Sequence, residues 1–263
     1  MRRPLVLSIA GHDPTGGAGI QADIEAIGAC GGRALSVVTC LTIQDTRTVF
    51  RCMPMDAASI TQSLQRLFAD LPVAAVKLGL TGSVEIARAI AGILATHPDI
   101  PVVLDPVLAS GDGTPLADLA LREALLDHLF PCLTLATPNS LEARTLSGEQ
   151  DLARCAERLL ARGAEALLIT GGHEPGESIV NRLFTREGAC VEHISPRIDR
   201  EFHGTGCTLS AAIATGLALH RPIEDAVETA LTYTLQTLAH ADQPGHGQAL
   251  PDRWFNCLPW PQR

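Results

Sequence analysis

The strongest constraint on the fold is a regular alternation of short, apolar, β-branched runs with longer segments whose apolar residues recur at helical spacing. The runs predicted as strands are Leu5–Ala10, Ala34–Ile43, Val73–Leu78, Ile100–Asp105, Cys132–Ala136 and Ala166–Thr170. The segments predicted as helices are Ile20–Cys30, Ala57–Ala69, Val84–Thr96, Leu116–Leu129 and Leu152–Ala161. Nearly continuous apolar strands are expected in a parallel sheet that helices cover on both faces. The pattern predicts a three-layer α/β/α fold with a mostly parallel central sheet.

The C-terminal part of the chain breaks this alternation. Ser178–Thr185 and Ala189–Ile194 flank a short turn that contains glycine, which predicts a hairpin that extends the sheet antiparallel. Two further helices are expected at about 207–219 and 223–240. Since no repeat or linker interrupts the sequence, residues 1–263 are predicted to form a single domain.

Composition excludes several classes of partner. The formal net charge of −9 and the absence of a basic run argue against binding of nucleic acid, which needs clustered Lys and Arg. The apolar stretch Leu5–Ala10 is too short for a signal-peptide core, and no later stretch is long enough to cross a membrane. We therefore expect a cytoplasmic protein with neither nucleic acid nor membrane as a partner.

Polar residues and glycines follow almost every predicted strand. These segments are Gly11–Gly19, Gln44–Thr46, Asp105-Pro106, Thr137–Asn139, Gly171–His173 and Phe202–Cys207. In doubly wound sheets, ligands bind outside the carboxyl ends of the strands. The sequence therefore predicts one ligand site at this edge of the sheet.

Two common nucleotide-binding motifs fit poorly. Gly17–Ala22 matches the dinucleotide pattern G-x-G-x-x-A, but Gly11–Gly16 separate it from the strand, so a nicotinamide enzyme is the weaker reading. Lys77 is the sole lysine and Leu78 follows it, which rules out a phosphate-binding P-loop. Phosphate must instead be held by backbone amides, arginine or a metal ion.

The run Gly204–Thr208 can supply such amides, since its glycines allow close approach and a predicted helix follows it. A tight helix cap without a ligand would show the same glycines. Cys207, in the first turn, favours an anion hole because the helix dipole stabilises a thiolate there. Bound phosphate would oppose that effect, so we expect only a modest net shift of the thiol pKa.

Together these segments resemble hydroxymethylpyrimidine/phosphomethylpyrimidine kinases. The resemblance rests on Ala10–Asp23, Gln44–Thr46, Val103–Val107, Thr137–Ala143, Gly171–His173 and His203–Ala211. It implies a ribokinase-like fold and ATP-dependent phosphorylation of 4-amino-5-hydroxymethyl-2-methylpyrimidine, and of its monophosphate, in thiamine pyrophosphate synthesis. It also implies Mg²⁺ as the metal ion and a homodimer.

The resemblance assigns roles to twelve residues of this chain. The catalytic group comprises Cys207 as the base that accepts the substrate's hydroxyl proton, with Gly204, Thr205 and Gly206 as the anion hole. The pyrimidine is assigned to Gly11, Asp23 and Gln44, ATP to Asn139, Thr170 and Gly172, and magnesium to Asp105 and Glu142. A carboxamide suits an aminopyrimidine because it offers a donor and an acceptor in one plane. Each carboxylate also has a structural alternative, as a turn cap or as a first-turn helix residue.

The chain departs from the family pattern at two places. Thr170 stands where relatives often carry lysine, and residues 108–113 lack a lysine commonly found there. Both departures concern ATP phosphate contacts and the second phosphorylation. Two other functions stay open: a pyridoxal-type kinase of the same superfamily, and a relative that senses a vitamin without turnover.

Overall fold

The computed structural model describes residues 3–111 and 113–256, which form a nine-stranded sheet. The strands are β1 Leu5–His12, β2 Arg33–Gln44, β3 Val49–Pro54, β4 Val73–Leu78, β5 Val102–Leu104, β6 Leu135–Ala136, β7 Ala166–Ile169, β8 Ser178–Thr185 and β9 Cys190–Pro196. Their order is β3-β2-β1-β4-β5-β6-β7-β8-β9. The central strands pair in parallel, whereas β3, β8 and β9 are antiparallel to their neighbours.

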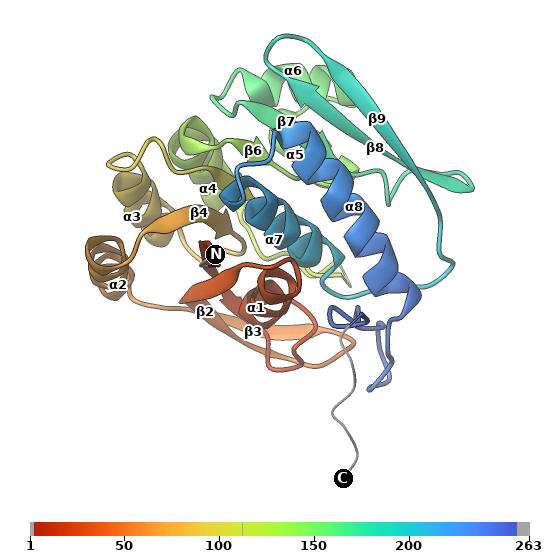
Figure 1. Ribbon diagram of the computed structural model, residues 1–263, viewed down its shortest axis with the longest axis horizontal. Helices are drawn as coiled ribbons and strands as arrows, with labels where there is room; N and C mark the ends of the chain where they lie inside the picture. Colours follow the sequence, from red (N-terminus) through yellow and green to blue (C-terminus); the bar gives the residue numbers. More distant parts are fainter. Residues whose placement is uncertain (1–2, 112, 257–263) are drawn as a thin grey trace.

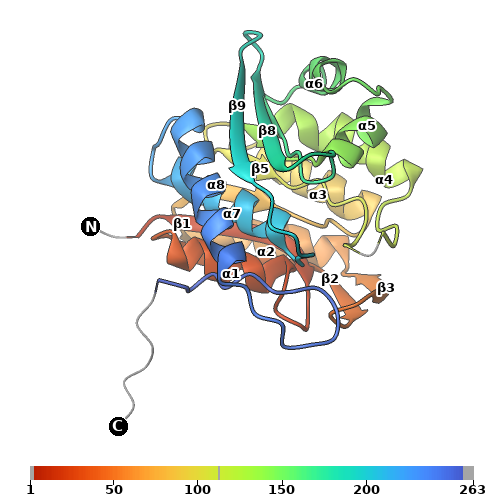
Figure 2. The same ribbon diagram turned by 90° about the vertical axis from the view of Figure 1, so that its right-hand side faces the viewer.

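Helices cover both faces of the sheet (Figure 1). One face carries α1 Gly19–Ala29, α7 Thr205–Ala218 and α8 Ile223–Ala239, whose buried side chains share one hydrophobic core. The other carries α2 Ala57–Asp70, α3 Val84–Leu94, α4 Leu119–Ala124, α5 Ser140–Ser147 and α6 Leu152–Leu160, which pack into a second core. The three-layer α/β/α prediction is confirmed, as is the antiparallel hairpin, which projects from the sheet in Figure 2.

All five helices of the second layer begin at a residue whose side chain accepts a hydrogen bond from a first-turn amide. These residues are Asp56, Ser83, Asp118, Asn139 and Asp151. Such caps satisfy amides that have no partner within the helix. The start of each of these helices is therefore fixed by a local sequence signal.

The structure differs from the predicted elements in four places. Of the strand predicted over Cys132–Ala136, only Leu135–Ala136 forms β6. Strand β3 and helix α5 are additional to the prediction. The helix predicted over Leu116–Leu129 begins only at Leu119 and passes after Ala124 into a wider π-turn, Leu125–Leu129, and a 3-10 turn, Phe130–Cys132. Within the described residues, no helix is both long and apolar enough to cross a membrane.

Candidate active site

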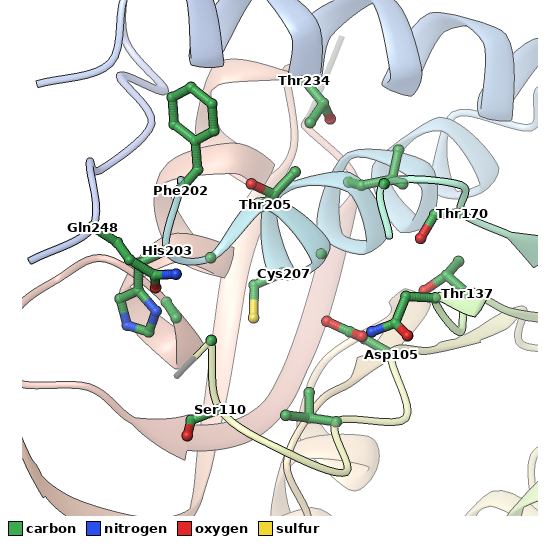
Figure 3. Close-up of a pocket in the computed structure, with 18 of the residues that line it drawn as sticks. Asp105, Ser110, Thr137, Thr170, Phe202, His203, Thr205, Cys207, Thr234 and Gln248 are labelled. Carbon is green, nitrogen blue, oxygen red and sulfur yellow. The ribbon is translucent and has the colours of Figure 1, made fainter. Parts of the chain in front are cut away.

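The carboxyl ends of the central strands open into a cavity of about 590 Å³. Its wall combines the loop after β1, the end of β2, the loops after β5, β6 and β7, and the start of α7. In Figure 3 the Cys207 sulphur and the Asp105 carboxylate project into this space from facing elements. A cavity of this size accommodates a small-molecule ligand.

Helix α7 begins at the cavity without a capping side chain. Its N-cap, Gly204, has φ of 86°, and a Cβ there would lie 1.9 Å from the carbonyl oxygen of Gly17. Glycine is therefore required both by the left-handed backbone and by the close contact. Because no side chain caps this terminus, its first amides are available to an anion, which is the arrangement expected of an anion hole. Thr205 and Gly206 line the cavity beside it.

Cys207 lies in the first turn of α7, as predicted, but its proton affinity is not as expected. Burial raises the pKa of the Cys207 thiol to about 12, although the charge of Lys77 and a hydrogen bond from the Gly19 amide oppose that rise. Repulsion from Asp105 and Asp23 adds to the effect of burial on this pKa. The expected modest shift is wrong because desolvation of the thiolate outweighs the charge of Lys77 and the Gly19 hydrogen bond.

Asp105 and Glu142 both line the cavity, as the sequence predicts. Burial raises the pKa of Asp105 to about 6 and that of Glu142 to about 8, and repulsion from Asp105 contributes to the second shift. The Glu142 oxygens accept hydrogen bonds from the amides of Asn139, at 2.9 Å, and Leu108, at 3.2 Å. Glu142 thus also has the structural role of completing a capping box at the start of α5.

These two carboxylates suit a hard divalent cation. Two acids that repel each other in a desolvated site gain when a cation neutralises them. Among the described residues there is no cluster of three or more His, Cys, Asp or Glu side chains that could hold a metal ion. Mg²⁺ is commonly bound by one or two carboxylates together with water and phosphate oxygens, so the residues present fit this ion.

The residues assigned to the pyrimidine occupy the cavity end formed by β1 and β2, with one exception. Gly11 and Gln44 line the cavity, and the Gln44 Nε2 donates to Thr42 Oγ1 at 2.6 Å. Thr42 Oγ1 in turn donates to the carbonyl of His12 at 2.8 Å, so the carboxamide is held in place. Asp23 is fully buried and is not part of the cavity wall. It is connected to the cavity through a residue that it binds and that does line the wall.

That residue is Lys77, which the sequence analysis used only to exclude a P-loop. Its Nζ lies 2.8 Å from Asp23 Oδ1, both side chains are fully buried, and Ser8 Oγ donates to the same carboxylate. Lys77 also lines the cavity, where its charge acts on Cys207 and Asp105. The sequence contained a signal for this ion pair, namely a lysine inside a strand that is otherwise apolar. A lysine buried in such a strand requires a partner of opposite charge.

The residues assigned to ATP gather at the opposite end of the cavity. Asn139, Thr170 and Gly172 all line it, and Asn139 and Thr170 form a parallel bridge between two strand ends. The Asn139 Oδ1 accepts from the amides of Leu141 and Glu142, so this side chain also caps α5. The side chain of Thr170 occupies the edge of the cavity in Figure 3.

A second pair missed by the sequence analysis joins the two glycine-rich loops. His203 Nε2 lies 2.8 Å from Asp13 Oδ2, and both residues line the cavity. Asp13 also accepts from the amides of Thr15 and Ala18, each at 2.8 Å. Burial opposes ionisation of Asp13, but hydrogen bonds from His203 and Thr15 prevail and lower its pKa. The carboxylate therefore fixes the first loop against the loop that precedes α7.

Comparison with known proteins gives a consistent result at the level of sequence. The profile of the phosphomethylpyrimidine kinase family matches residues 13–252. A hydroxymethylpyrimidine/phosphomethylpyrimidine kinase of Rhizobium meliloti is 39% identical in an alignment of 251 positions that covers 93% of this chain and 94% of that protein. The thiamine biosynthesis multifunctional protein ThiED of Corynebacterium efficiens is 37% identical in an alignment of 277 positions that covers 98% of this chain, but this chain spans only 37% of its length.

Comparison of structures agrees. Pyridoxal kinase of Bacillus subtilis, solved as an ADP complex, matches with a TM-score of 0.87 and 26% identity over 96% of this chain and 98% of that chain. The predicted ribokinase-like fold is thereby confirmed. The family match supports the kinase activity more strongly than the structural likeness does, because it includes the cavity-lining segments from Asp13 to Gln248. The chain belongs to the phosphomethylpyrimidine kinase family and is a kinase with a ribokinase-like fold.

Proposed function

We propose that this chain transfers the γ-phosphoryl group of ATP to the hydroxymethyl group of 4-amino-5-hydroxymethyl-2-methylpyrimidine, and then phosphorylates the monophosphate, in thiamine biosynthesis. The observation that carries the proposal is the uncapped start of α7, which borders the cavity next to Asp105 (Figure 3). A Cβ on Gly206 would lie 3.1 Å from Asp105 Oδ2, so the amides and the carboxylate border the same small space. The names of the relatives support the choice of substrate.

The residues of this chain would share the work of transfer as follows. The amides of Gly204, Thr205 and Gly206 would stabilise the charge on the transferred phosphoryl group, which is the main requirement of this reaction. Cys207 would accept the hydroxyl proton of the substrate. Because burial raises the pKa of this thiol to about 12, Cys207 would have to release its own proton to solvent before it could accept that of the substrate. The charge of Lys77 already acts in that direction.

We assign Mg²⁺ to Asp105 and Glu142, with contact through bound water. When bound, the cation would supply positive charge to the phosphate oxygens and remove the repulsion between the two carboxylates. It would also cancel the contribution of Asp105 to the high pKa of Cys207. The hydrogen bonds that Glu142 accepts from Asn139 and Leu108 leave lone pairs on both oxygens for such contacts.

The two ends of the cavity would separate the two substrates. Gln44 and Gly11 would bind the pyrimidine ring, and Asp23 would act on it through Lys77. Thr170, Gly172 and Asn139 would contact ATP. These nucleotide assignments follow from the family pattern and from the position of all three residues on the cavity wall.

A pyridoxal-type kinase is the second candidate. It is favoured by the structural match to a pyridoxal kinase and by the hydroxymethyl group that pyridoxal and the pyrimidine both carry on their rings. An ATP-coupled assay with the hydroxymethylpyrimidine, its monophosphate and pyridoxal separates the possibilities. Turnover of the pyrimidine with the higher kcat/KM supports the proposal, preference for pyridoxal supports the second candidate, and binding without turnover identifies a vitamin-sensing relative.

We further propose a cytoplasmic homodimer. An apolar surface on β2 and β3 supports a dimer, since Phe50 is 68% exposed and Ile43 is 50% exposed. Exposed apolar side chains on neighbouring strands of a sheet edge are typical of an interface. Light scattering of the wild type and of Phe50→Glu tests this assignment: a monomeric wild type contradicts it, and a Phe50→Glu monomer supports this surface.

A further inference from the structure

Arg253 lies in the segment that follows α8, and its guanidinium is buried inside the protein. Figure 2 shows this segment, in dark blue, running below α1. The residue is only 2% exposed and is among the largest fully buried side chains. Arginine keeps its charge inside proteins, so a buried guanidinium requires partners for its five donors.

The guanidinium binds three separate segments. Its Nε donates to Thr208 Oγ1 in the first turns of α7 at 2.8 Å. Its Nη1 donates to the carbonyl of Gly16 at 3.3 Å and pairs with Glu25 Oε2 on α1 at 3.1 Å. Its Nη2 donates to the carbonyl of Gly17. One side chain therefore connects the first glycine-rich loop, α1 and α7.

Two of these contacts converge on Gly204, the residue that opens the anion hole. Thr208 Oγ1, which accepts from Arg253, donates to the carbonyl of Gly204 at 2.9 Å. The Gly17 carbonyl, which also accepts from Arg253, packs directly on Gly204. Arg253 thus holds Gly204 from two sides, through one hydroxyl and one carbonyl.

We propose that Arg253 is a positioning residue for phosphoryl transfer, which fixes the start of α7 against the first glycine-rich loop so that the anion-hole amides are aligned in advance. Amides that are already oriented stabilise developing charge without reorganisation, and a misplacement of about 1 Å can lower a rate roughly 100-fold. This inference rests on the proposed function, since it assigns Arg253 to the transfer step.

The competing explanation is that Arg253 only anchors the C-terminal segment. That segment has other anchors: the Tyr233 hydroxyl donates to the Arg253 carbonyl at 2.9 Å, and the Trp254 ring packs against Gly28. Within the described part of the chain, the positive charge of Arg253 is neutralised by Glu25 alone, whose side chain is 40% exposed. Trp254→Ala and Glu25→Gln are therefore matched controls for anchoring and for charge.

The experiment compares Arg253→Met, Arg253→Lys and Thr208→Val with these two controls. Steady-state kcat and KM for ATP and the hydroxymethylpyrimidine are measured, with the Tm of each variant. We expect Arg253→Met to lower kcat about 10- to 100-fold with both KM values within about threefold, because alignment acts in the transition state. Arg253→Lys should recover part of kcat, and the controls should stay within about twofold of wild type.

Thr208→Val keeps the shape of the side chain and removes only the hydroxyl that links Arg253 to Gly204, so it tests the inference even if Arg253→Met does not fold. We expect a smaller loss of kcat, about three- to tenfold. A kcat within twofold of wild type in both folded Arg253→Met and Thr208→Val would overturn the inference. So would an equal loss in Trp254→Ala. If the wild-type enzyme does not phosphorylate the pyrimidine, the proposed function itself is contradicted. If the wild type is active and the variants are equally active, only the role of Arg253 is contradicted.

Discussion

The Nζ of Lys77 lies 2.8 Å from the Oδ1 of Asp23, and neither side chain is exposed to solvent. Lys77 places a positive charge at the cavity, where it favours the ionised forms of Cys207 and Asp105, whereas the charge of Asp23 opposes them. Burial opposes the charged form of Lys77, but attraction to Asp23 and then to Cys207 and Asp105 prevails and raises its pKa. The sole lysine of the chain is therefore charged and part of the active site.

Loss of either partner should destabilise the protein. Lys77→Met leaves the Asp23 carboxylate buried without its counter-charge, which costs about 3–5 kcal/mol of unfolding free energy. The double variant Lys77→Met/Asp23→Leu removes both charges and should recover most of that stability, but not kcat, because the cavity has lost its cation. Urea unfolding and steady-state kinetics check both parts. A double variant with wild-type kcat would show that the pair is structural only.

Cys207 should be slow to alkylate at neutral pH. Since burial raises the pKa of its thiol to about 12, the thiolate fraction should rise about tenfold for each pH unit up to pH 10. The rate of reaction with iodoacetamide, followed by mass spectrometry of the Cys207 peptide, measures this slope, with exposed Cys190 as internal reference. A rate for Cys207 that levels off below pH 9 would contradict the raised pKa.

Substitution of Cys207 tests its proposed role separately. If it accepts the substrate proton, Cys207→Ala should lower kcat by about 10²–10⁴ with little change in KM. Cys207→Asp should restore part of the activity, because a carboxylate can accept the proton. A folded Cys207→Ala enzyme with nearly normal kcat would make Cys207 a packing residue of a crowded helix start.

The two acids of the proposed magnesium site should make the protein less stable as pH rises. Burial raises the pKa of Asp105 to about 6 and of Glu142 to about 8, so the folded state binds these protons more tightly than the unfolded chain. Their contribution to stability is thus complete below about pH 4 and is lost progressively up to about pH 8. We expect Tm to fall across this range, and Mg²⁺ to restore it most strongly near pH 8.

Glu142→Gln is the control for that experiment. It removes the titration of Glu142 and should flatten the fall in Tm between about pH 6 and pH 8. It should also weaken the effect of Mg²⁺ on Tm and on kcat. If Mg²⁺ raises the Tm of Glu142→Gln and of Asp105→Asn as much as that of wild type, the cation binds elsewhere.

Gln44 should determine affinity for the pyrimidine. Gln44→Leu leaves the polar edge of the ring unpaired, which costs about 1–3 kcal/mol and raises KM roughly 5- to 150-fold. Thr42→Val releases the Nε2 that Thr42 Oγ1 now holds, so it should raise the same KM by a smaller factor. A changed KM for ATP with an unaltered KM for the pyrimidine would place Gln44 in the nucleotide pocket.

The sequence predicted the fold well where burial dominates. Strands β1, β4 and β7 read as continuous apolar runs because helices cover both of their faces. Strand β3 was missed because it is an edge strand with exposed Phe50 and Arg51 and a proline at its end. Helix α5 was missed because its eight residues are short and largely polar, and its start is fixed by a capping box instead of an apolar face.

The residues of the cavity wall were predictable where they follow strand ends, as Asp105 and Gln44 do, or form a continuous motif, whereas pairs formed between distant segments were not. The run Gly204–Cys207 predicts an anion hole because its glycines, its cysteine and the start of a helix are contiguous in the sequence. Lys77 and Asp23 are 54 residues apart, and His203 and Asp13 are 190 apart, so their pairing depends on the order of the strands. The pKa of Cys207 could not be predicted either, because it is set by burial, which is a property of the folded state.

The contact between His203 and Asp13 should make the effects of substituting these two residues on catalysis depend on each other. The His203 Nε2 and Asp13 Oδ2 are 2.8 Å apart and join the first glycine-rich loop to the start of α7. If this contact aligns the anion hole, Asp13→Asn and His203→Gln should each lower kcat, and the double variant should lose little more than either single one. The expected coupling is about 0.5–3 kcal/mol in a double-mutant cycle on kcat/KM. Hydrogen bonds from His203 and Thr15 outweigh burial and lower the pKa of Asp13, so its contribution to stability is present above about pH 4 and lost as pH falls further. Asp13→Asn should therefore also reduce the acid sensitivity of Tm below about pH 4. Additive losses of kcat/KM in the cycle would show that the two residues act independently.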